Sequence, residues 1–431
     1  MSTNLSVSDM FKEFLDNLRI DNSDHISLRY GEITACLNKR FRDTESKTAN
    51  SLQVGSYGRW TGIRSISDLD MLYIMPASKW NDYKNGGQSK LLEDTKDAIK
   101  ARYPTTTVKV DRLVVRVLYS NFHVEVQPVF EQEDGSFKYP DTYYGSSWKI
   151  TKPRDEIVAT SELEQQKNKN MRRLCKMARA WKNKHGVGMG GLLIDTLAHN
   201  FLKSTSEYDN KSFLYYDYLS RDFFKYLADQ PDQDYYAALG SGQRVQVKQK
   251  FQKKAKKAHE LCLKAIDSEN TDSVNDKWKK VYGRPFPSKY STKSTAVKSM
   301  AWTNTEQFIE DRYSVDIRFS LKLDCEVSQN GFRQHYLTEM VTKHIPLLAD
   351  KKLKFWIEQI DVPGIYSIEW KVLNRGDEAQ RRDCIRGQIV KDDGHNEKIE
   401  HTKFRGYHIV ECYAIQNGVV VAKDRIDVPI S

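Results

Sequence analysis

The chain has 431 residues, 39% of them hydrophobic and 29% charged, with a formal net charge of +10 at pH 7. The length indicates two or three domains, and the lack of an apolar run long enough to cross a bilayer excludes a membrane-embedded protein. Residues 301–431 carry 19 Lys and Arg against 21 Asp and Glu, so the positive excess lies in residues 1–300. That excess suits a protein that holds several phosphates, and no membrane partner is expected.

The cysteines and the first residues of the chain bear on its location. The six cysteines are Cys36, Cys175, Cys262, Cys325, Cys384 and Cys412. They form no short-spaced pairs, which excludes a zinc ribbon and a disulfide framework. The opening residues have neither the basic flank nor the apolar core of a secretory signal. We therefore expect a protein of the reducing cytoplasm.

An amphipathic helix is the first element that the sequence predicts. Apolar side chains recur at helical spacing at Ile26, Tyr30, Ile33, Leu37 and Phe41. The segment from about 50 to 130 is then predicted to form strands. A loop at Asn85–Gly87 and a helix near Leu91–Ala101 interrupt these strands.

Two motifs at the start of the strand region carry the chemistry. Gly55-Ser56 predicts a turn whose backbone N–H groups and hydroxyl suit a triphosphate. Asp68 and Asp70 are spaced i, i+2 at the start of an apolar strand, so both point to the same face of the sheet. Their mutual repulsion is relieved by Mg²⁺, which prefers oxygen ligands and also takes phosphate oxygens.

A third acid is expected beside these two. Residues Val108–Tyr119 alternate like one strand, Ser120-Asn121 suits a tight turn, and the next strand places Glu125 on its polar face. Glu125 is therefore the expected third ligand. His123 lies on the same face and is interpreted as a hydrogen-bonding neighbour, because Mg²⁺ favours oxygen. Pro128 is expected to end the strand pairing or to mark an edge.

The segment from about 160 to 280 is predicted to be mainly helical. One apolar stripe is formed by Met171, Leu174, Cys175, Ala178 and Trp181. The adjoining face of that helix carries three basic residues, Arg172, Lys176 and Arg179. The lysine-rich run Lys248–Lys264 is interpreted as a solvated helix face. Trp60, Trp181 and Trp278 are interpreted as packing residues.

The last third of the chain has a different pattern. Pro285, Pro287 and the run Ser288–Ser299, rich in Ser, Thr and Lys, predict a linker. Beyond Trp302 the sequence alternates like β structure. Asn417-Gly418, between two alternating segments, predicts a β-hairpin.

Together these motifs resemble the polymerase-β-type nucleotidyltransferases. Within them they resemble the bacterial CD-NTases, the cGAS/DncV-like cyclic oligonucleotide synthases of CBASS anti-phage defence. The segments that carry the likeness are Gly55–Ile63, with its Gly-Ser-x-x-Arg-x-Thr form, Gly240–Val245, Phe251–Ala258, Trp278 and Gly283–Pro287. The segments Trp370–Gly376, Ile385–Gln388 and Ala422–Ile426 resemble the AGS-C domain, a proposed C-terminal sensor.

The resemblance implies an α+β fold in several parts. Residues 1–155 are expected to form a polymerase-β-like catalytic core, with a mixed sheet, helices and an N-terminal brace helix. Residues 156–287 are expected to form a helical lobe that completes the nucleotide pocket. A linker over 288–300 then leads to a β-sandwich-like sensor domain over 301–431.

The resemblance also implies the site residues. Asp68, Asp70 and Glu125 are expected to be catalytic and to bind two Mg²⁺ ions, for which Mn²⁺ substitutes. The expected nucleotide-binding residues are Gly55, Ser56, Arg59, Thr61, Lys176, Arg179 and Ser212. Arg179 stands two positions before Trp181, where lysine is the commoner residue in the family. Gly190-Gly191-Leu192 stands where many relatives have a serine–tyrosine pair, and Ser212 is taken as a replacement.

The function that the resemblance implies is synthesis of a cyclic di- or trinucleotide second messenger from NTPs, ATP and/or GTP, with release of pyrophosphate. The product would activate a separate effector in the bacterial cytoplasm, and the C-terminal domain would bind an unknown activating ligand. Three alternatives stay open. They are a linear oligonucleotide synthase or RNA-tailing enzyme, a nucleotidyltransferase that modifies a protein or tRNA, and a nucleotide-binding sensor that has lost catalysis.

Overall fold

The protein divides into two compact units, Met1–Trp181 with Gly190–Lys289, and Lys182–Met189 with Tyr290–Ser431. The computed structural model describes residues 6–20, 23–64, 66–119, 122–143, 145–269, 271–288, 307, 309, 312–329, 332–374, 387–402 and 406–430. The turn expected at Ser120-Asn121 and residues 289–300 of the expected linker lie outside these ranges. The expected domain boundaries at 155 and 300 stay predictions.

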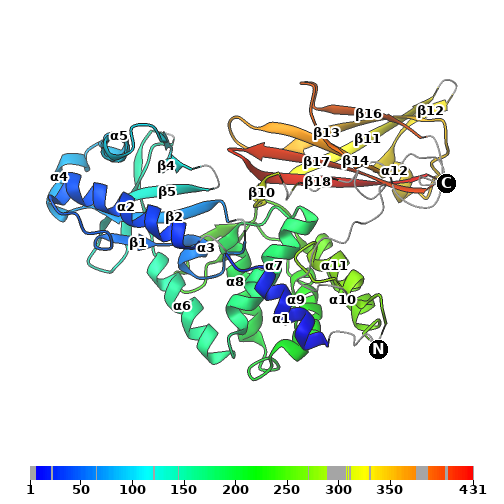
Figure 1. Cartoon of the computed structure of the whole chain (residues 1–431), viewed down its shortest axis with the longest axis horizontal. Helices are drawn as coiled ribbons and strands as arrows, with labels where there is room; N and C mark the ends of the chain where they lie inside the picture. The colour runs from blue at the N-terminus through cyan, green and yellow to red at the C-terminus, as the bar shows by residue number, and fades with distance from the viewer. Residues whose placement is uncertain are drawn as a thin grey trace. The chain divides into compact units, whose positions relative to one another are not determined.

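A seven-stranded mixed sheet forms the framework of the first unit (Figure 1). Its strands are β1 (Ser51–Gln53), β2 (Asp68–Ile74), β3 (Thr107–Asp111), β4 (Val114–Leu118), β5 (His123–Glu131), β6 (Phe137–Asp141) and β7 (Ser147–Thr151). The order is β1-β2-β5-β4-β3, and β6 and β7 continue from the end of β5. β2 and β5 pair in parallel at the centre, and the other pairs are antiparallel.

Two helices, α2 (Ser23–Arg42) and α5 (Gln88–Arg102), cover one face of this sheet (Figure 1). The predicted apolar stripe of α2 is confirmed, because Ile26, Ile33 and Leu37 are fully buried against the sheet. Leu69 and Met71 of β2 point into this core, so the alternating positions Asp68 and Asp70 lie on the opposite face. Shorter helical turns are α3 (Gly55–Gly58), η1 (Ala77–Lys79) and α4 (Trp80–Tyr83).

Two details of the strands differ from the sequence prediction. Val108–Tyr119 is not one strand, because the chain turns back between β3 and β4 at Arg112, whose φ is 56°. Pro128 does not end the pairing of β5 with β2, which continues to Val129. It lies beyond the last β4 pair, at Val126, so no hydrogen bond to β4 requires the missing N–H.

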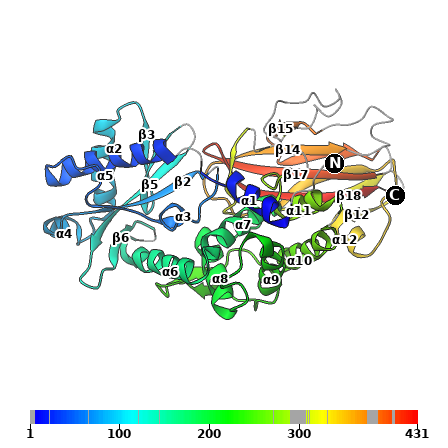
Figure 2. The same cartoon turned by 60° about the horizontal axis from the view of Figure 1, so that its bottom comes forward.

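The rest of the first unit is a helical lobe, which Figure 2 shows as a group of helices around α7, α8 and α9. Its elements are α1 (Val7–Asn17), α6 (Pro153–Gln166), α7 (Asn170–His185), α8 (Gly191–Ser204), η2 (Phe213–Tyr215), α9 (Tyr216–Ala228), β8 (Tyr235–Ala237), β9 (Arg244–Gln246), α10 (Gln252–Ile266) and α11 (Val274–Tyr282). Phe11 and Phe14 of α1 pack against Trp278, Tyr282 and Phe286, with ring centroids 4.7–6.3 Å apart. This aromatic cluster fixes the N-terminal helix to the lobe.

The second unit contains two packed sheets. Its elements are β10 (Ser314–Val315), β11 (Leu321–Gln329), β12 (Phe332–Tyr336), α12 (Leu337–Thr342), β13 (Lys352–Ile360), β14 (Ser367–Asn374), β15 (Ile389–Lys391), β16 (Glu397–His401), β17 (Gly406–Gln416) and β18 (Val419–Ile430). The sheet orders are β10-β18-β17-β14-β15 and β12-β11-β13-β16. Phe355 from one sheet and Trp370 and Cys412 from the other share one core. The predicted hairpin is confirmed, with positive φ at Asn417 and Gly418.

These two units confirm the expected α+β fold class, with a mixed sheet and helices followed by a β-sandwich-like region. In the part of the chain that the structure describes, no helix is both long and apolar enough to span a bilayer. The thiols of Cys36, Cys175, Cys262, Cys325 and Cys412 are free.

Candidate active site

The parallel pairing of β2 and β5 brings the three predicted acids together. Asp68 lies directly beside His123 in this pair, and Asp70 lies directly beside Glu125. All four side chains project from the face opposite α2 and α5, because the intervening residues, such as Leu69 and Val124, are buried in the core. The expectation that the Glu125 strand pairs beside the Asp68/Asp70 strand is therefore confirmed.

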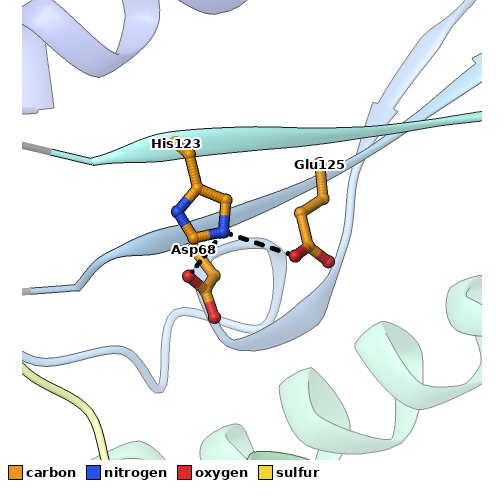
Figure 3. Close-up of side chains that lie close together, drawn as sticks. All are labelled: Asp68, His123 and Glu125. Atoms are coloured by element: carbon orange, nitrogen blue, oxygen red, sulfur yellow. Dashed lines mark hydrogen bonds and ion pairs between the residues drawn. The ribbon is translucent and has the colours of Figure 1, made fainter. Parts of the chain in front are cut away.

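His123 joins two of the carboxylates (Figure 3). Its Nε2 lies 2.9 Å from Oδ1 of Asp68 and 3.3 Å from Oε1 of Glu125. Burial of the imidazole opposes its positive charge, but the hydrogen bonds and charges of Asp68 and Glu125 outweigh burial and raise the pKa of His123 to about 9. The interpretation of His123 as a hydrogen-bonding neighbour agrees with this geometry.

The donor set fits a divalent cation. Asp68, His123 and Glu125 each offer one ligand atom, and these atoms lie within 4.8 Å of one another. Carboxylate oxygens are the ligands that Mg²⁺ and Mn²⁺ take in proteins. The residues present are therefore suited to hold such an ion, with Asp70 contributing from the next position on the same face of β2.

Glu125 has a second basic partner, which the sequence analysis missed. Arg116 of β4 is directly opposite Glu125 and donates from Nε at 2.9 Å and from Nη2 at 2.8 Å to the same oxygen, Oε1. Its Nη1 lies 2.7 Å from Oδ2 of Asp111. The only signal in the sequence is the alternation that places Arg116 on the polar face of its strand, between the buried Val115 and Val117.

The Gly-Ser turn is packed directly on the acid strand. Gly55 has a φ of 64°, and a Cβ at this position would lie only 1.8 Å from Oδ2 of Asp70. The backbone N–H of Val54 donates to the carbonyl of Asp70 at 3.1 Å. A glycine is therefore required at this position for two reasons: its positive φ, and the lack of space for a Cβ beside the Asp70 carboxylate. Because Ser56 directly follows Gly55 in the sequence, the same contact holds its backbone near Asp70.

The remainder of the motif forms a buried ionic network around Asp195 of α8. Arg59 donates from Nε to Asp195 at 2.9 Å and pairs through Nη1 with Glu156 at 3.0 Å. The Thr61 hydroxyl donates to Asp195 at 2.8 Å, and Arg179 pairs with both of its oxygens at 2.5 and 3.0 Å. Burial disfavours the charge on Asp195, but the two arginines outweigh it and lower the pKa of the carboxyl to about 2.

This network gives Arg59, Thr61 and Arg179 structural partners in addition to their predicted role. The guanidinium groups of Arg59 and Arg179 are almost fully buried, and Arg179 also donates to the carbonyl of Gly191 at 3.1 Å. Their contact with nucleotide stays a prediction. Asp195 is not among the residues predicted from the sequence. Its position inside the apolar run Leu193–Leu197 of α8 was a usable signal, because a buried acid needs a partner.

The other predicted nucleotide-binding residues lie elsewhere in the helical lobe. Lys176 is half-buried on α7, and burial lowers its pKa; the charges of Arg172 and Arg19 act in the same direction, and the charge of Glu164 opposes them. Ser212 directly precedes η2, and Tyr216 at the start of the following helix α9 is fully buried and donates to Asn170 at 2.6 Å. The roles of Lys176 and Ser212 also stay predictions.

Trp60 departs from its predicted packing role. Its side chain is 64% exposed and its φ is 61°. Its ring is stacked on that of Tyr57, with a centroid distance of 6.3 Å and an angle of 21° between the ring planes. The packing interpretation is therefore wrong for Trp60, whereas Trp181 and Trp278 are buried as expected.

Comparison with known proteins identifies both parts of the chain. The profile of the Second Messenger Oligonucleotide or Dinucleotide Synthetase domain matches residues 5–164, and that of the Adenylyl/Guanylyl and SMODS C-terminal sensor domain matches residues 303–431. A comparison with curated protein sequences finds no match.

Several solved structures are similar to this chain. CdnC of E. coli MS115-1, solved with ATP, has 16% identity and a TM-score of 0.49, over 67% of this chain and 100% of that one. DncV of Escherichia coli, in its 3′-deoxy GTP bound form, has 14% identity and a TM-score of 0.45, over 56% and 70%. DncV of Vibrio cholerae, in complex with the linear intermediate 5′ pppA(3′,5′)pG, has 13% identity and a TM-score of 0.44, over 56% and 69%.

The two domain matches lie in different units of the structure, and the acids Asp68, Asp70 and Glu125 all fall within the synthetase match. The chain therefore belongs to the CD-NTases, nucleotidyltransferases of the cyclic oligonucleotide synthase type, and carries an AGS-C sensor domain.

Proposed function

We propose that this enzyme uses divalent metal ions bound at Asp68, Asp70 and Glu125 to join NTPs into a cyclic oligonucleotide, with release of pyrophosphate. The observation that carries the proposal is the strand register, which sets Asp70 beside Glu125 while the Gly-Ser turn packs on the Asp70 carboxylate. Nucleotidyl transfer requires metal-binding acids next to a turn that binds the phosphates of the NTP.

Each group of residues has one task in this proposal. Asp68, Asp70 and Glu125 hold two Mg²⁺ ions, for which Mn²⁺ substitutes. When bound, such ions neutralise the triphosphate and lower the pKa of the acceptor hydroxyl. The Gly55-Ser56 turn binds the donor phosphates through its N–H groups and the serine hydroxyl. Lys176 neutralises further phosphate charge. The phosphate in turn offsets the energetic penalty of burying the charged ammonium group of Lys176.

The reaction follows from this arrangement. An acceptor ribose hydroxyl attacks the α-phosphorus of the donor NTP, a new phosphorus–oxygen bond forms, and the bond to the β-phosphate breaks. Pyrophosphate leaves with the bonding electron pair, and the hydroxyl proton passes to solvent. A second transfer within the linear intermediate closes the ring. We further propose that the product activates a separate effector in bacterial anti-phage defence, and that the AGS-C domain binds the activating ligand.

The test is incubation of the full chain with all four NTPs and Mg²⁺ or Mn²⁺, followed by mass spectrometry before and after phosphatase treatment. A product that keeps its mass after phosphatase is cyclic, because it has no terminal phosphate. The variant Asp68→Asn with Asp70→Asn should release no pyrophosphate while it stays folded. The control, Asp82→Asn with Asp97→Asn, removes two exposed carboxylates of the same unit and should keep full activity.

Other outcomes would favour the alternatives. A phosphatase-sensitive product indicates a linear oligonucleotide synthase. Label on a protein or RNA, without a small product, indicates transfer to a macromolecule. NTP binding without turnover in either metal indicates a sensor that has lost catalysis. Full activity of the Asp68/Asp70 double variant would overturn the assignment of the site.

A further inference from the structure

The third carboxylate of the site is the end of a row of charged side chains across three strands. Asp111 of β3 pairs with Nη1 of Arg116 on β4 at 2.7 Å. Arg116 then donates twice to Oε1 of Glu125 on β5, from Nε at 2.9 Å and from Nη2 at 2.8 Å. The register places Arg116 directly opposite Glu125, so this contact spans the shortest distance between the two strands.

This row is a sheltered and well-anchored arrangement. The side chains of Arg116 and Glu125 are each only 18% exposed. The residues on either side of Arg116, Val115 and Val117, are fully buried in the core beneath the sheet, which fixes the backbone of β4. A charge-assisted pair that shares two N–H donors with one oxygen has a defined geometry, unlike an exposed lysine pair.

Glu125 needs a basic partner such as Arg116 because other carboxylates lie close to it. Asp68, Asp70 and Glu125 repel one another whenever no cation lies between them. A glutamate has three rotatable bonds, so repulsion would turn the Glu125 carboxylate away from the aspartates. Arg116 opposes that movement because it binds Oε1 from the side of β4, while His123 contacts the same oxygen at 3.3 Å.

We propose that Arg116 is a positioning residue, which holds the carboxylate of Glu125 at the place where it serves as a metal ligand. This inference rests on the proposed function, since it requires that Glu125 bind metal. Arg116 contacts the carboxylates of Asp111 and Glu125, and in this role it acts through Glu125. Its positive charge alone would weaken the binding of a cation nearby, whereas its positioning of Glu125 strengthens that binding. The two effects therefore have opposite signs and can be separated.

The experiment measures Mn²⁺ binding to the full chain by electron paramagnetic resonance, with no nucleotide present, together with the Mg²⁺ concentration that gives half-maximal pyrophosphate release. Arg116→Ala should weaken Mn²⁺ binding and raise the half-maximal Mg²⁺ concentration by about tenfold or more, as is typical for the loss of a partner of a metal ligand. Arg116→Lys keeps the charge but not the two-donor contact, and should behave like Arg116→Ala.

Two controls separate positioning from charge and from folding. Lys109→Ala removes an exposed cation directly opposite Arg116 on β3 and should leave Mn²⁺ binding unchanged. In a Glu125→Gln background, Arg116→Ala should not weaken Mn²⁺ binding further, because the group that it positions has lost its charge and only the repulsion by the Arg116 cation is removed.

The outcomes distinguish the two levels of the argument. If wild-type protein binds Mn²⁺ and Arg116→Ala binds it equally or more tightly, the positioning role is overturned and the proposed function is not. If Arg116→Lys retains wild-type binding while Arg116→Ala loses it, any cation beside Glu125 is sufficient and the two-donor contact is not needed, so the inference is also overturned. A wild-type protein that binds no Mn²⁺ and releases no pyrophosphate overturns the proposed function, and this inference with it.

Discussion

The buried network around Asp195 makes a quantitative prediction about stability. We consider Asp195→Asn, which keeps the size of the side chain and removes its charge. In the wild type, this fully buried carboxylate accepts hydrogen bonds from Arg59, Thr61 and Arg179. The variant leaves the nearly buried Arg59 paired with Glu156, and the nearly buried Arg179 hydrogen-bonded to the backbone carbonyls of Cys175 and Gly191.

The expected loss can be estimated in two ways. A pKa of about 2 in place of 3.8 corresponds to about 2–3 kcal/mol of stability at neutral pH. Removal of one partner from a buried ion pair typically costs about 3–5 kcal/mol, because the other charge stays buried without compensation. We therefore expect Asp195→Asn to lower the free energy of unfolding by about 2–5 kcal/mol, and the melting temperature by roughly 5–15 °C.

The sign of the pH dependence gives a second measurement. Because the pKa of Asp195 is lowered by folding, its contribution is present above about pH 4 and is lost as the pH falls toward 2. The difference in melting temperature between wild type and Asp195→Asn should therefore be constant from pH 7 to about 4.5 and shrink below that. Calorimetry over this range tests both points.

A matched control supports the interpretation. Asp229→Asn removes an exposed carboxylate of the same lobe, which pairs with Lys225 at 2.8 Å, and should change the free energy of unfolding by less than about 0.5 kcal/mol. The reasoning fails if Asp195→Asn unfolds within about 1 kcal/mol of the wild type at pH 7.

Two further predictions concern the Gly-Ser motif. Gly55→Ala should reduce pyrophosphate release at least about 100-fold, because its Cβ would lie 1.8 Å from Oδ2 of Asp70. Gly86→Ala, which shares a positive φ of 74° but has no neighbour within 4 Å, should keep full activity, and similar losses in both would contradict the steric argument. Trp60→Gly should keep the free energy of unfolding within about 1 kcal/mol of the wild type or raise it, since the exposed Trp60 has a φ of 61°. Trp278→Ala should lower it by about 3–5 kcal/mol, and chemical denaturation compares the two.

Much of the site geometry was accessible from the sequence because it depends on local periodicity. The i, i+2 spacing of Asp68 and Asp70 and the alternation around Glu125 were enough to place each acid on the polar face of a strand. The parallel register that sets Asp70 beside Glu125 confirms the expected pairing. Strands with one buried face specify their register strongly, since a shift by one residue would bury these acids.

The features that the sequence analysis missed depend on contacts between distant segments. The β3–β4 turn at Arg112 has no Gly or Asn to reveal its positive φ, so one strand was predicted in place of two. The partners of Asp195 come from α7, from the Gly-Ser motif and, through Arg59, from α6. No spacing within one element predicts such a network, because its energetics depend on burial that only the packed lobe creates.

The same network distinguishes the two basic residues that the sequence placed on one helix face. Arg179 has both carboxylate oxygens of Asp195 and two backbone carbonyls as acceptors, so phosphate would have to compete with four existing hydrogen bonds. Lys176, almost one turn earlier on α7, is disfavoured as a cation by burial and by Arg172 and Arg19 nearby, which together outweigh the opposing charge of Glu164 and lower its pKa. A triphosphate would relieve that penalty at Lys176 and would gain nothing comparable at Arg179. The balance of partners therefore favours Lys176 as the phosphate contact and Arg179 as a structural support for the Gly-Ser turn, although the family pattern before Trp181 pointed to Arg179.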